Sequence, residues 1–441
     1  MVVKSLVQPI LLHHNNITVI VVSFGLLYGI TSLLQSSSPS VHDEGSFQST
    51  WMYRLLINLI GYSTILLPGY FIFKYVRVTK YLERSGAGCL SNIIDCCING
   101  REPGLVEASN DSPVRTLKQD TLLLLFCFVG LQGTYLTWGI LQEKVMTQEY
   151  TNSAGDVGHF KDSQFLVFVN RILAFTLSGS YLLLRKQPKH TMPLYKYAYC
   201  SFSNIMSSWC QYEALKYVSF PSQVLAKASK LIPVMIMGKI VSKQKYEYYE
   251  YVTAVLISIG MTFFMLSSAP KKDETVTTMS GIILLGAYMT FDSFTSNWQG
   301  ALFTQYKVSP VQMMCCVNLF SCLFTSVSLF QQGAFSTSLQ FMATFPKFTI
   351  DCLLISISSG AGQLFVFFTI YSYGPVIFVI IMTIRQGLAI LLSCLIYNHT
   401  LPPLGIFGIM LVFGAIFLRI YCNQRLKAIR LRLHSVSSSK V

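Results

Sequence analysis

Residues 375–397 read PVIFVIIMTIRQGLAILLSCLIY, an apolar run that contains one charged residue, Arg385. A helix of this length crosses the roughly 30 Å hydrocarbon core of a lipid bilayer. Comparable runs recur from residue 17 to residue 421, separated by short polar breaks. The whole chain is 52% hydrophobic and 12% charged, a balance that soluble globular domains do not have. The sequence therefore predicts an all-α polytopic membrane protein that works within the lipid bilayer.

We count twelve candidate membrane spans. They cover about 17–34, 53–76, 120–141, 163–184, 193–214, 218–240, 250–268, 279–303, 311–331, 347–371, 375–397 and 402–421. The first is followed by small polar residues, as a cleaved signal segment would be, but its length favours a retained helix. The span at 193–214 is the most polar and is credible only as a helix that faces protein or a polar cavity.

A polar stretch at 77–119, which contains several glycines and no helical stripe, divides the chain. We interpret it as a cytosolic linker between an N-terminal extension with about two spans (1–76) and a block of ten spans. The remaining domains are two groups of five spans at 120–268 and 279–421, a luminal linker at 269–278, and a basic cytosolic tail at 422–441. Because five is odd, the second group enters the membrane from the opposite side, which predicts two inverted five-helix repeats.

Weak internal similarity supports this division. Aligning Pro221 with Pro375 also aligns Gly260 with Gly414 and keeps the apolar runs between them in step. Inverted repeats place a binding site near the bilayer midplane, between the two halves. Ligand-binding residues are therefore expected near the middle of the spans.

Loop charges predict the orientation of the chain. Basic residues in the loops after 163–184 and 218–240, and in the tail, all fall on one side, which the positive-inside tendency makes cytosolic. This orientation explains the net charge of +14 better than nucleic-acid binding does. The loops near 142–162 and 332–346 then face the lumen. Asn398, in the sequon NHT, is a candidate glycosylation site on that side.

Three cations lie where the bilayer disfavours them. Lys227 and Lys230 fall within the span 218–240, and Arg385 lies near the centre of 375–397. A cation at the centre of a membrane helix costs roughly 2.5–3.5 kcal/mol on insertion scales. The two lysines are three residues apart and share one helix face with Gln223, so that face is too polar to point at lipid.

A bound anion would balance these charges. The acids that the sequence buries, Glu213 and Asp292, are too few to neutralise the set. We expect Arg385 to make a bidentate contact with a phosphate or sulfate group and the lysines to act as point charges. The alternative is that the cations reach the headgroup region or pair with carboxylates on other helices.

Other polar and aromatic residues in the spans are candidates for contacts with the rest of a ligand. Asn297, Gln363 and Gln386 are candidate readers of a base or ribose, and Tyr212 offers a stacking surface. Hydrogen bonds between helices and ordinary aromatic packing are the alternatives for these residues.

No motif in the sequence indicates an enzyme. There is no P-loop, no zinc-ligand spacing and no GxSxG elbow, so we expect no catalytic residue, no metal and no cofactor. A vacant site with three uncompensated cations should reorient slowly in the membrane, which favours exchange of one anion for another. The sequence thus predicts a passive carrier or an exchanger.

Several strings resemble the nucleotide-sugar transporter family of the drug/metabolite transporter superfamily. They are WGILQE (138–143), DSQFLVF (162–168) and FPSQVLAKASKLIPVMIMGK (220–239). Two more, FDSFTSNWQGALF (291–303) and IIMTIRQGLAILLSCLIYNHT (380–400), are similar to the family members that carry adenosine 3′-phospho 5′-phosphosulfate (PAPS). The likeness covers roughly residues 120–421.

The resemblance implies ten core helices in two inverted repeats, alternating access, and a multi-pass place in the Golgi membrane. It implies delivery of PAPS from the cytosol to the Golgi lumen for sulfation, in exchange for an adenosine nucleotide. The helices that carry Lys227, Lys230 and Arg385 would line the nucleotide cavity. Alternatives are a carrier of another nucleotide or nucleotide sugar and, from a different class, a non-transporting membrane scaffold. Assembly into a homo-oligomer is left open.

Overall fold

A computed structural model describes most of the chain. The described residues are 51–81, 89–100, 117–152, 155, 157–160, 162–185, 191–214, 217–218, 227, 229–268, 279–306, 308–331, 333–396 and 403–438. The expected span at 17–34, Gln223 and the sequon at Asn398 lie outside them. The described residues belong to two compact units. Unit 1 comes from 1–114, 134–202 and 308–364, and unit 2 comes from 115–133, 203–307 and 365–441.

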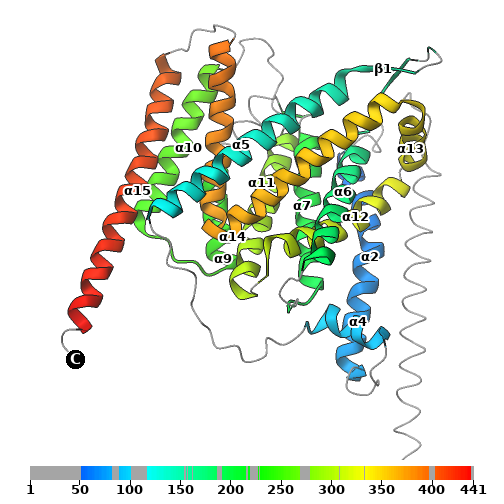
Figure 1. Cartoon of the computed structure of the whole chain (residues 1–441), viewed down its shortest axis with the longest axis horizontal. Coiled ribbons are helices and arrows are strands. Elements are labelled where there is room, and N and C mark those ends of the chain that lie inside the picture. Colours follow the sequence, from blue (N-terminus) through cyan, green and yellow to red (C-terminus); the bar gives the residue numbers. More distant parts are fainter. Residues whose placement is uncertain are drawn as a thin grey trace, which may run out of the picture. The chain divides into compact units, whose positions relative to one another are not determined.

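The secondary structure is helical apart from one small hairpin in the described part of the chain (Figure 1). The helices are α2 (Trp51–Thr79), α4 (Cys89–Ile98), α5 (Leu117–Thr147), α6 (Ser163–Leu184), α7 (Tyr195–Ala214), α9 (Leu231–Val241), α10 (Tyr248–Ser268), α11 (Met279–Gln305), α12 (Pro310–Gln331), α13 (Ala334–Thr344), α14 (Pro346–Ile396) and α15 (Pro403–Ser438). Strands β1 (Glu149–Thr151) and β2 (Val157–His159) pair antiparallel, with Tyr150 opposite Gly158.

Six of these helices are long and apolar enough to cross a membrane. The stretches are Asn58–Thr79, Lys118–Gln142, Gln164–Leu184, Pro310–Phe330, Pro346–Arg385 and Pro403–Asn423. Helices α7 and α11 are long enough but carry many polar side chains, and α9 and the apolar part of α10 are shorter. The prediction of an all-α polytopic membrane protein is confirmed, whereas the division into two inverted five-helix repeats stays a prediction.

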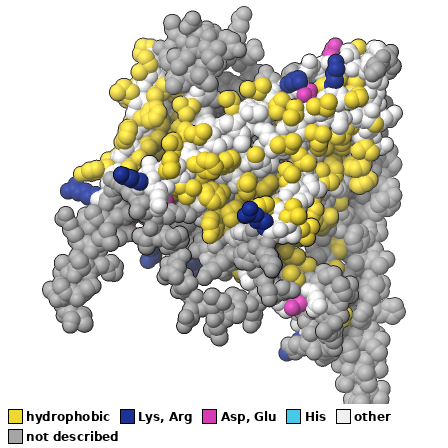
Figure 2. All heavy atoms as spheres, viewed as in Figure 1, with side chains coloured by type: hydrophobic (Ala, Val, Ile, Leu, Met, Phe, Trp, Pro, Cys, Tyr) yellow, Lys and Arg dark blue, Asp and Glu magenta, His cyan; other side chains and the backbone are white. Residues whose placement is uncertain are grey.

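The outer surface of these helices suits lipid. Leu122, Leu125, Phe126 and Val129 form a stripe along α5, and each is more than half exposed (69%, 56%, 59% and 59%). Hydrophobic side chains dominate the described part of the face in Figure 2. A soluble protein rarely exposes so continuous an apolar surface, because contact with water would be unfavourable.

Helix α14 joins two of the expected spans. The predicted spans 347–371 and 375–397 form one long helix with a kink at Gly374, where φ is 82° and ψ is 170°. These angles are accessible essentially to glycine alone. Pro375 follows and lacks the backbone N–H that would continue the hydrogen-bond ladder, so the kink lies where the sequence places the break.

The stretch expected to be a linker without a helix contains one. Helix α4 occupies Cys89–Ile98, so that expectation was wrong over these residues. Ile94 and Ile98 lie one turn apart on one face of the helix, and Ile98 is buried. The glycines on either side make this pattern hard to recognise in the sequence. Gly100 ends the helix with a φ of 69° and approaches the carbonyl of Thr191 so closely that a side chain would not fit.

Unit 1 has an aromatic core beneath the hairpin. The rings of Phe160 and Phe348 lie 4.5 Å apart, and those of Phe341 and Phe345 also lie 4.5 Å apart. Gly158 on β2 faces this core, since a Cβ there would lie 2.8 Å from both Phe341 and Phe345. The expected loops at 142–162 and 332–346 thus contain the hairpin and α13, which the sequence did not reveal because both elements are short.

Asp351 ties the hairpin to two helices of unit 1. Its Oδ1 lies 2.9 Å from Lys144 Nζ on α5, and its Oδ2 accepts a hydrogen bond from Tyr150 Oη at 3.0 Å. Burial, followed by the hydrogen bond to Asp351, raises the pKa of Tyr150 above its usual range, so the phenol remains a donor.

The two contacts of Asp351 should differ in strength. The Lys144 side chain is 46% exposed and that of Asp351 is 10% exposed. We expect Asp351→Ala to destabilise the protein by roughly 2–3 kcal/mol, because buried Tyr150 loses a charged acceptor. Lys144→Ala should cost less than about 1 kcal/mol, as exposed ion pairs usually do. Thermal unfolding in detergent measures both, with exposed Lys347→Ala as a control, and equal losses for the first two variants would contradict this ranking.

Candidate functional site

The three cations predicted to hold an anion come together in unit 2. The Lys227 ammonium lies within Coulombic range of both the Arg385 guanidinium and the Lys230 ammonium. Lys227 is helical, Lys230 lies in the turn before α9, and Arg385 lies on α14 beyond the kink. Side chains more than 150 positions apart in the sequence thus form one cluster of positive charge, which we call the cation cluster (Lys227, Lys230 and Arg385).

The expected span 218–240 contains a turn at Ser229 and Lys230, between helical Lys227 and α9. The Lys230 N–H donates to the Lys227 carbonyl over 3.4 Å, and the Ile232 N–H donates to the Ser229 carbonyl over 3.3 Å. These bonds span three residues, as in a tight turn, and α9 begins only at Leu231. Pro233 lies in the first turn of α9, where its missing N–H leaves no bond unmade. In the described part of the expected span 218–240, a turn at Ser229 and Lys230 therefore precedes the short helix α9.

One carboxylate, that of Asp292, lies beside the cation cluster. Lys230 Nζ forms an ion pair with Asp292 Oδ2 on α11, and the two side chains are 15% and 24% exposed. Pairing with a carboxylate on another helix was the alternative considered for the buried cations, and the structure shows such a pair for Lys230. Lys227 has no acidic partner among the residues that the structure describes. The described cluster thus contains three cations and lies beside one carboxylate.

Asn297 connects helices within unit 2. Its side chain is fully buried, and its Nδ2 donates to the Val234 carbonyl at 2.8 Å and to the Ser293 carbonyl at 2.9 Å. Its Oδ1 lies close to Gly238, where a Cβ would be only 2.8 Å away. These contacts support the alternative of a hydrogen bond between α9 and α11. A contact of Asn297 with a base or ribose stays a prediction.

Tyr246 closes the other side of Gly238. A Cβ on Gly238 would collide with the Tyr246 hydroxyl, which donates to Gln244 Oε1 at 2.6 Å. Burial raises the pKa of Tyr246 to about 12, so the hydroxyl is a neutral donor at physiological pH. The lack of a side chain at Gly238 therefore lets α9 pack tightly against its neighbours in unit 2.

Gln363 belongs to unit 1 and has partners there. Its Oε1 accepts from Asn318 Nδ2 at 2.8 Å, and Arg171 Nη1 approaches Asn318 Oδ1 at 3.5 Å. The structure therefore gives Gln363 a place in a polar group on α6, α12 and α14, and its role toward a ligand stays a prediction. Tyr212 and Gln386 belong to α7 and α14, but their side chains lie outside the described part of the chain, so their roles also stay predictions.

The pairing of Asp292 with Lys230 was not predicted, although the sequence indicates that Asp292 needs a partner. Asp292 is the only acid in the span 279–303, and membrane helices rarely keep an unpaired carboxylate. What the sequence lacked was the distance across helices that selects Lys230, rather than Lys227 or Arg385, as the partner.

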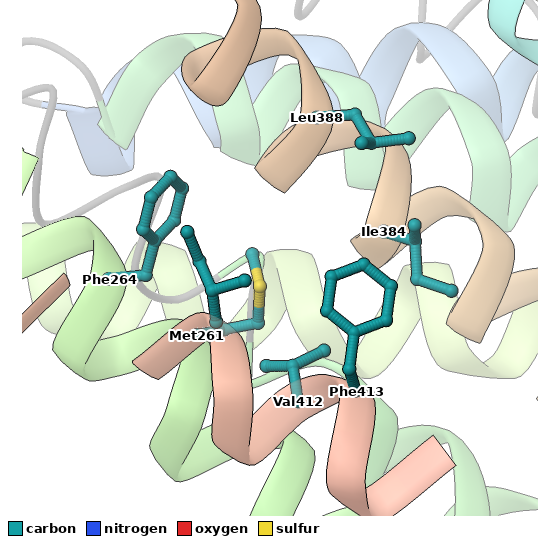
Figure 3. Close-up of a pocket in the computed structure, with 7 residues that line it drawn as sticks. Met261, Phe264, Ile384, Leu388, Val412 and Phe413 are labelled. Carbon is teal, nitrogen blue, oxygen red and sulfur yellow. The ribbon is translucent and has the colours of Figure 1, made fainter. Parts of the chain in front are cut away.

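An apolar pocket in unit 2 is not a site for an anion. It is lined by Met261, Phe264, Ile384, Leu388, Ile409, Val412 and Phe413, from α10, α14 and α15 (Figure 3). These side chains offer carbon and sulfur but no hydrogen-bond donor. Ile384 and Leu388 lie one turn apart on α14, whereas Arg385 is rotated about 100° from Ile384 on the helix. Anion binding is therefore expected at the cation cluster.

The cation cluster has the chemistry of an anion site. Lysine ammonium groups offer point charges, and the arginine guanidinium offers paired donors that match phosphate or sulfate oxygens. In the part of the chain that the structure describes, His, Cys, Asp and Glu form no group able to hold a metal ion.

Comparisons with known proteins give evidence that is independent of the cation cluster. Residues 123–423 match the family described as the UAA transporter family. The chain is 55% identical over 396 residues to adenosine 3′-phospho 5′-phosphosulfate transporter 1 of Drosophila melanogaster, which covers 87% of this chain and 85% of the fly protein. The human protein of that name is 52% identical over 392 residues, which cover 87% of this chain and 90% of the human protein.

A more distant relative carries a different name. UDP-galactose/UDP-glucose transporter 5B of Arabidopsis thaliana is 35% identical over 307 residues, which cover 68% of this chain and 88% of the plant protein. The residues matched by the family include all four members of the ionic group, Lys227, Lys230, Asp292 and Arg385.

Proposed function

Because the chain belongs to the UAA transporter family, we propose that it carries PAPS from the cytosol into the Golgi lumen, where PAPS supplies sulfation. Its fly and human relatives are named as transporters of this compound. We further propose that PAPS enters in exchange for an adenosine nucleotide, by alternating access, without enzymatic chemistry and without a cofactor.

The cation cluster is the observation that carries this proposal. PAPS bears a 3′-phosphate in addition to its phosphosulfate, so it presents separate negative groups. Lys227 and Arg385 lie within Coulombic range of each other and would repel one another in the absence of an anion. A bound phosphate or sulfate would relieve that repulsion and offset part of the cost of holding cations in the membrane.

A second candidate substrate is a nucleotide sugar. The Arabidopsis relative, at 35% identity, is named for UDP-galactose and UDP-glucose. A UDP-sugar offers a diphosphate but no 3′-phosphate, so it leaves more of the cluster unneutralised than PAPS does. The higher identity to the PAPS transporters and this charge balance together favour PAPS.

Uptake by purified protein in liposomes tests the proposal. We expect saturable uptake of radiolabelled PAPS that is several-fold faster when the vesicles are preloaded with adenosine 3′,5′-bisphosphate. External adenosine 3′,5′-bisphosphate should compete strongly, and UDP-galactose should not. Strong competition by UDP-galactose would favour the nucleotide-sugar carrier, equal uptake with and without preloading would contradict exchange, and absence of any nucleotide uptake would favour the membrane scaffold.

A further inference from the structure

We propose that Asp292 is the internal counter-anion of the carrier. In the empty site its carboxylate holds Lys230, and a phosphate or sulfate oxygen of the substrate displaces it. This inference rests on the proposed function and assigns to Asp292 the role of controlling how strongly the site binds its substrate and how readily the empty site reorients.

The contacts of Asp292 differ from those of other acids in the described residues. Asp351 is held by both Lys144 and Tyr150, and Glu250 is held by Arg419 at 3.0 Å and by the backbone N–H of Glu247 at 3.0 Å. These carboxylates are each fixed by two donors. For the Asp292 carboxylate, the ion pair with Lys230 is the only contact of this kind among the residues that the structure describes. A carboxylate with one ionic contact can leave its partner at a lower cost than one held at both oxygens.

The surroundings of the pair also favour replacement. The side chains of Lys230 and Asp292 are 15% and 24% exposed, although the paired Oδ2 of Asp292 is itself buried. Lys227 lies one turn away from Lys230 and has no acidic partner in the described part of the chain. An incoming anion therefore meets Lys227 directly and competes with Asp292 for Lys230.

This competition has two consequences for transport. Asp292 weakens substrate binding, because its negative charge must move away from Lys230 before a second negative group takes its place. It also neutralises one cation of the empty site, so that the empty carrier reorients more readily than it would with the charge of Lys230 uncompensated. Asp292 thus sets the ratio between exchange and net uptake.

The test compares wild type with Asp292→Asn in liposomes. We expect the variant to bind PAPS about tenfold more tightly, measured both as KM and as the rise in melting temperature caused by PAPS in detergent. Uptake into preloaded vesicles divided by uptake into empty vesicles should rise at least about threefold. Glu250→Gln removes a carboxylate of similar burial from another ion pair of unit 2 and should leave this ratio at the wild-type value.

Two results would overturn the inference. One is weaker PAPS binding by Asp292→Asn, with preloaded and empty uptake reduced in proportion, since a purely structural carboxylate would behave in that way. If Asp292→Asn does not fold, the test instead compares Lys230→Gln with the double variant Lys230→Gln/Asp292→Asn. We expect the double variant to bind PAPS more tightly than Lys230→Gln, which leaves the carboxylate facing the substrate, and equal affinities would contradict the inference.

These outcomes are separable from those of the proposed function. Absence of PAPS uptake by wild type contradicts the proposed function. Normal PAPS exchange by wild type, with an unchanged ratio in Asp292→Asn, contradicts only the role of Asp292.

Discussion

Replacing Lys227 with glutamine is expected to reduce PAPS exchange by about ten- to hundredfold, mainly through a higher KM. Lys227 has no acidic partner in the described part of the chain, so its charge is available to the substrate. A hydrogen bond to a charged group contributes roughly 1.5–3 kcal/mol, and each 1.4 kcal/mol is a factor of about ten in affinity.

The stability of this variant distinguishes a binding role from a structural one. Removing Lys227 also removes its repulsion with Arg385 and Lys230, so the melting temperature without ligand should be equal to or above that of wild type. A structural lysine would instead leave the protein less stable.

Lys239 provides a matched control for Lys227. It lies in the last turn of α9 and is exposed, so Lys239→Gln should leave uptake unchanged. Lys227→Arg keeps the charge and should retain part of the activity. Wild-type uptake by Lys227→Gln, at equal amounts of protein in the vesicles, would remove Lys227 from the site and strengthen the alternative of a membrane scaffold.

The second large effect is expected at Gly408. Helices α10 and α15 lie side by side in unit 2 (Figure 1), and their backbones meet at Gly260 and Gly408. A Cβ on Gly408 would lie 2.5 Å from the Gly260 carbonyl oxygen and 2.7 Å from the Phe264 backbone nitrogen. Both are backbone atoms, which cannot move aside as a flexible side chain can. Such small residues let membrane helices pack closely.

We therefore expect Gly408→Val to destabilise the protein by about 3 kcal/mol or more and to lower its yield of folded material. Gly414→Val is the matched control, because Gly414 lies on the same helix and a Cβ added to it would meet no atom within 4 Å. Melting temperature and gel filtration in detergent measure both variants. Similar melting temperatures would show that the two helices can separate at Gly408 without cost.

Much of the fold was accessible from the sequence because apolar length and helix ends are local properties. The span predicted at 163–184 matches α6 at both ends, where the Asp162 side chain caps the first turn and Arg185 follows the last. The break between the expected spans at 371 and 375 corresponds to the kink at Gly374. The family resemblance carried by the quoted strings is also confirmed by the match over residues 123–423.

Elements that depend on tertiary contacts were harder to predict. The hairpin at Tyr150 and Gly158 is stabilised by rings from distant helices, which no local pattern reports. Helix α4 was missed because it has only ten residues and lies between stretches that contain glycines. Gly260 and Gly414, aligned as equivalent positions of the two repeats, have different surroundings in the structure, so their equivalence stays a prediction.

The candidate site was predicted in part. Charge in an apolar run is visible in a sequence, and it selected Lys227, Lys230 and Arg385. The structure places Lys227 within Coulombic range of each of the other two. Which acid pairs with which cation depends on how helices face each other, and that information is absent from the sequence. Asn297 and Gln363 were selected by their polarity alone. The sequence does not show which groups they face, and their described partners are protein groups.

The kink in α14 also bears on which substitutions the chain tolerates. No atom lies within 4 Å of where a Cβ would stand on Gly374, so there is room for a larger residue there. The backbone angles, rather than crowding, exclude other amino acids at this position. An alanine would fit the space and still straighten the helix or strain it, and the arm that carries Arg385 would then point in a new direction. Gly374, about three helical turns before Arg385, thus sets the direction of the helix segment that carries the Arg385 guanidinium.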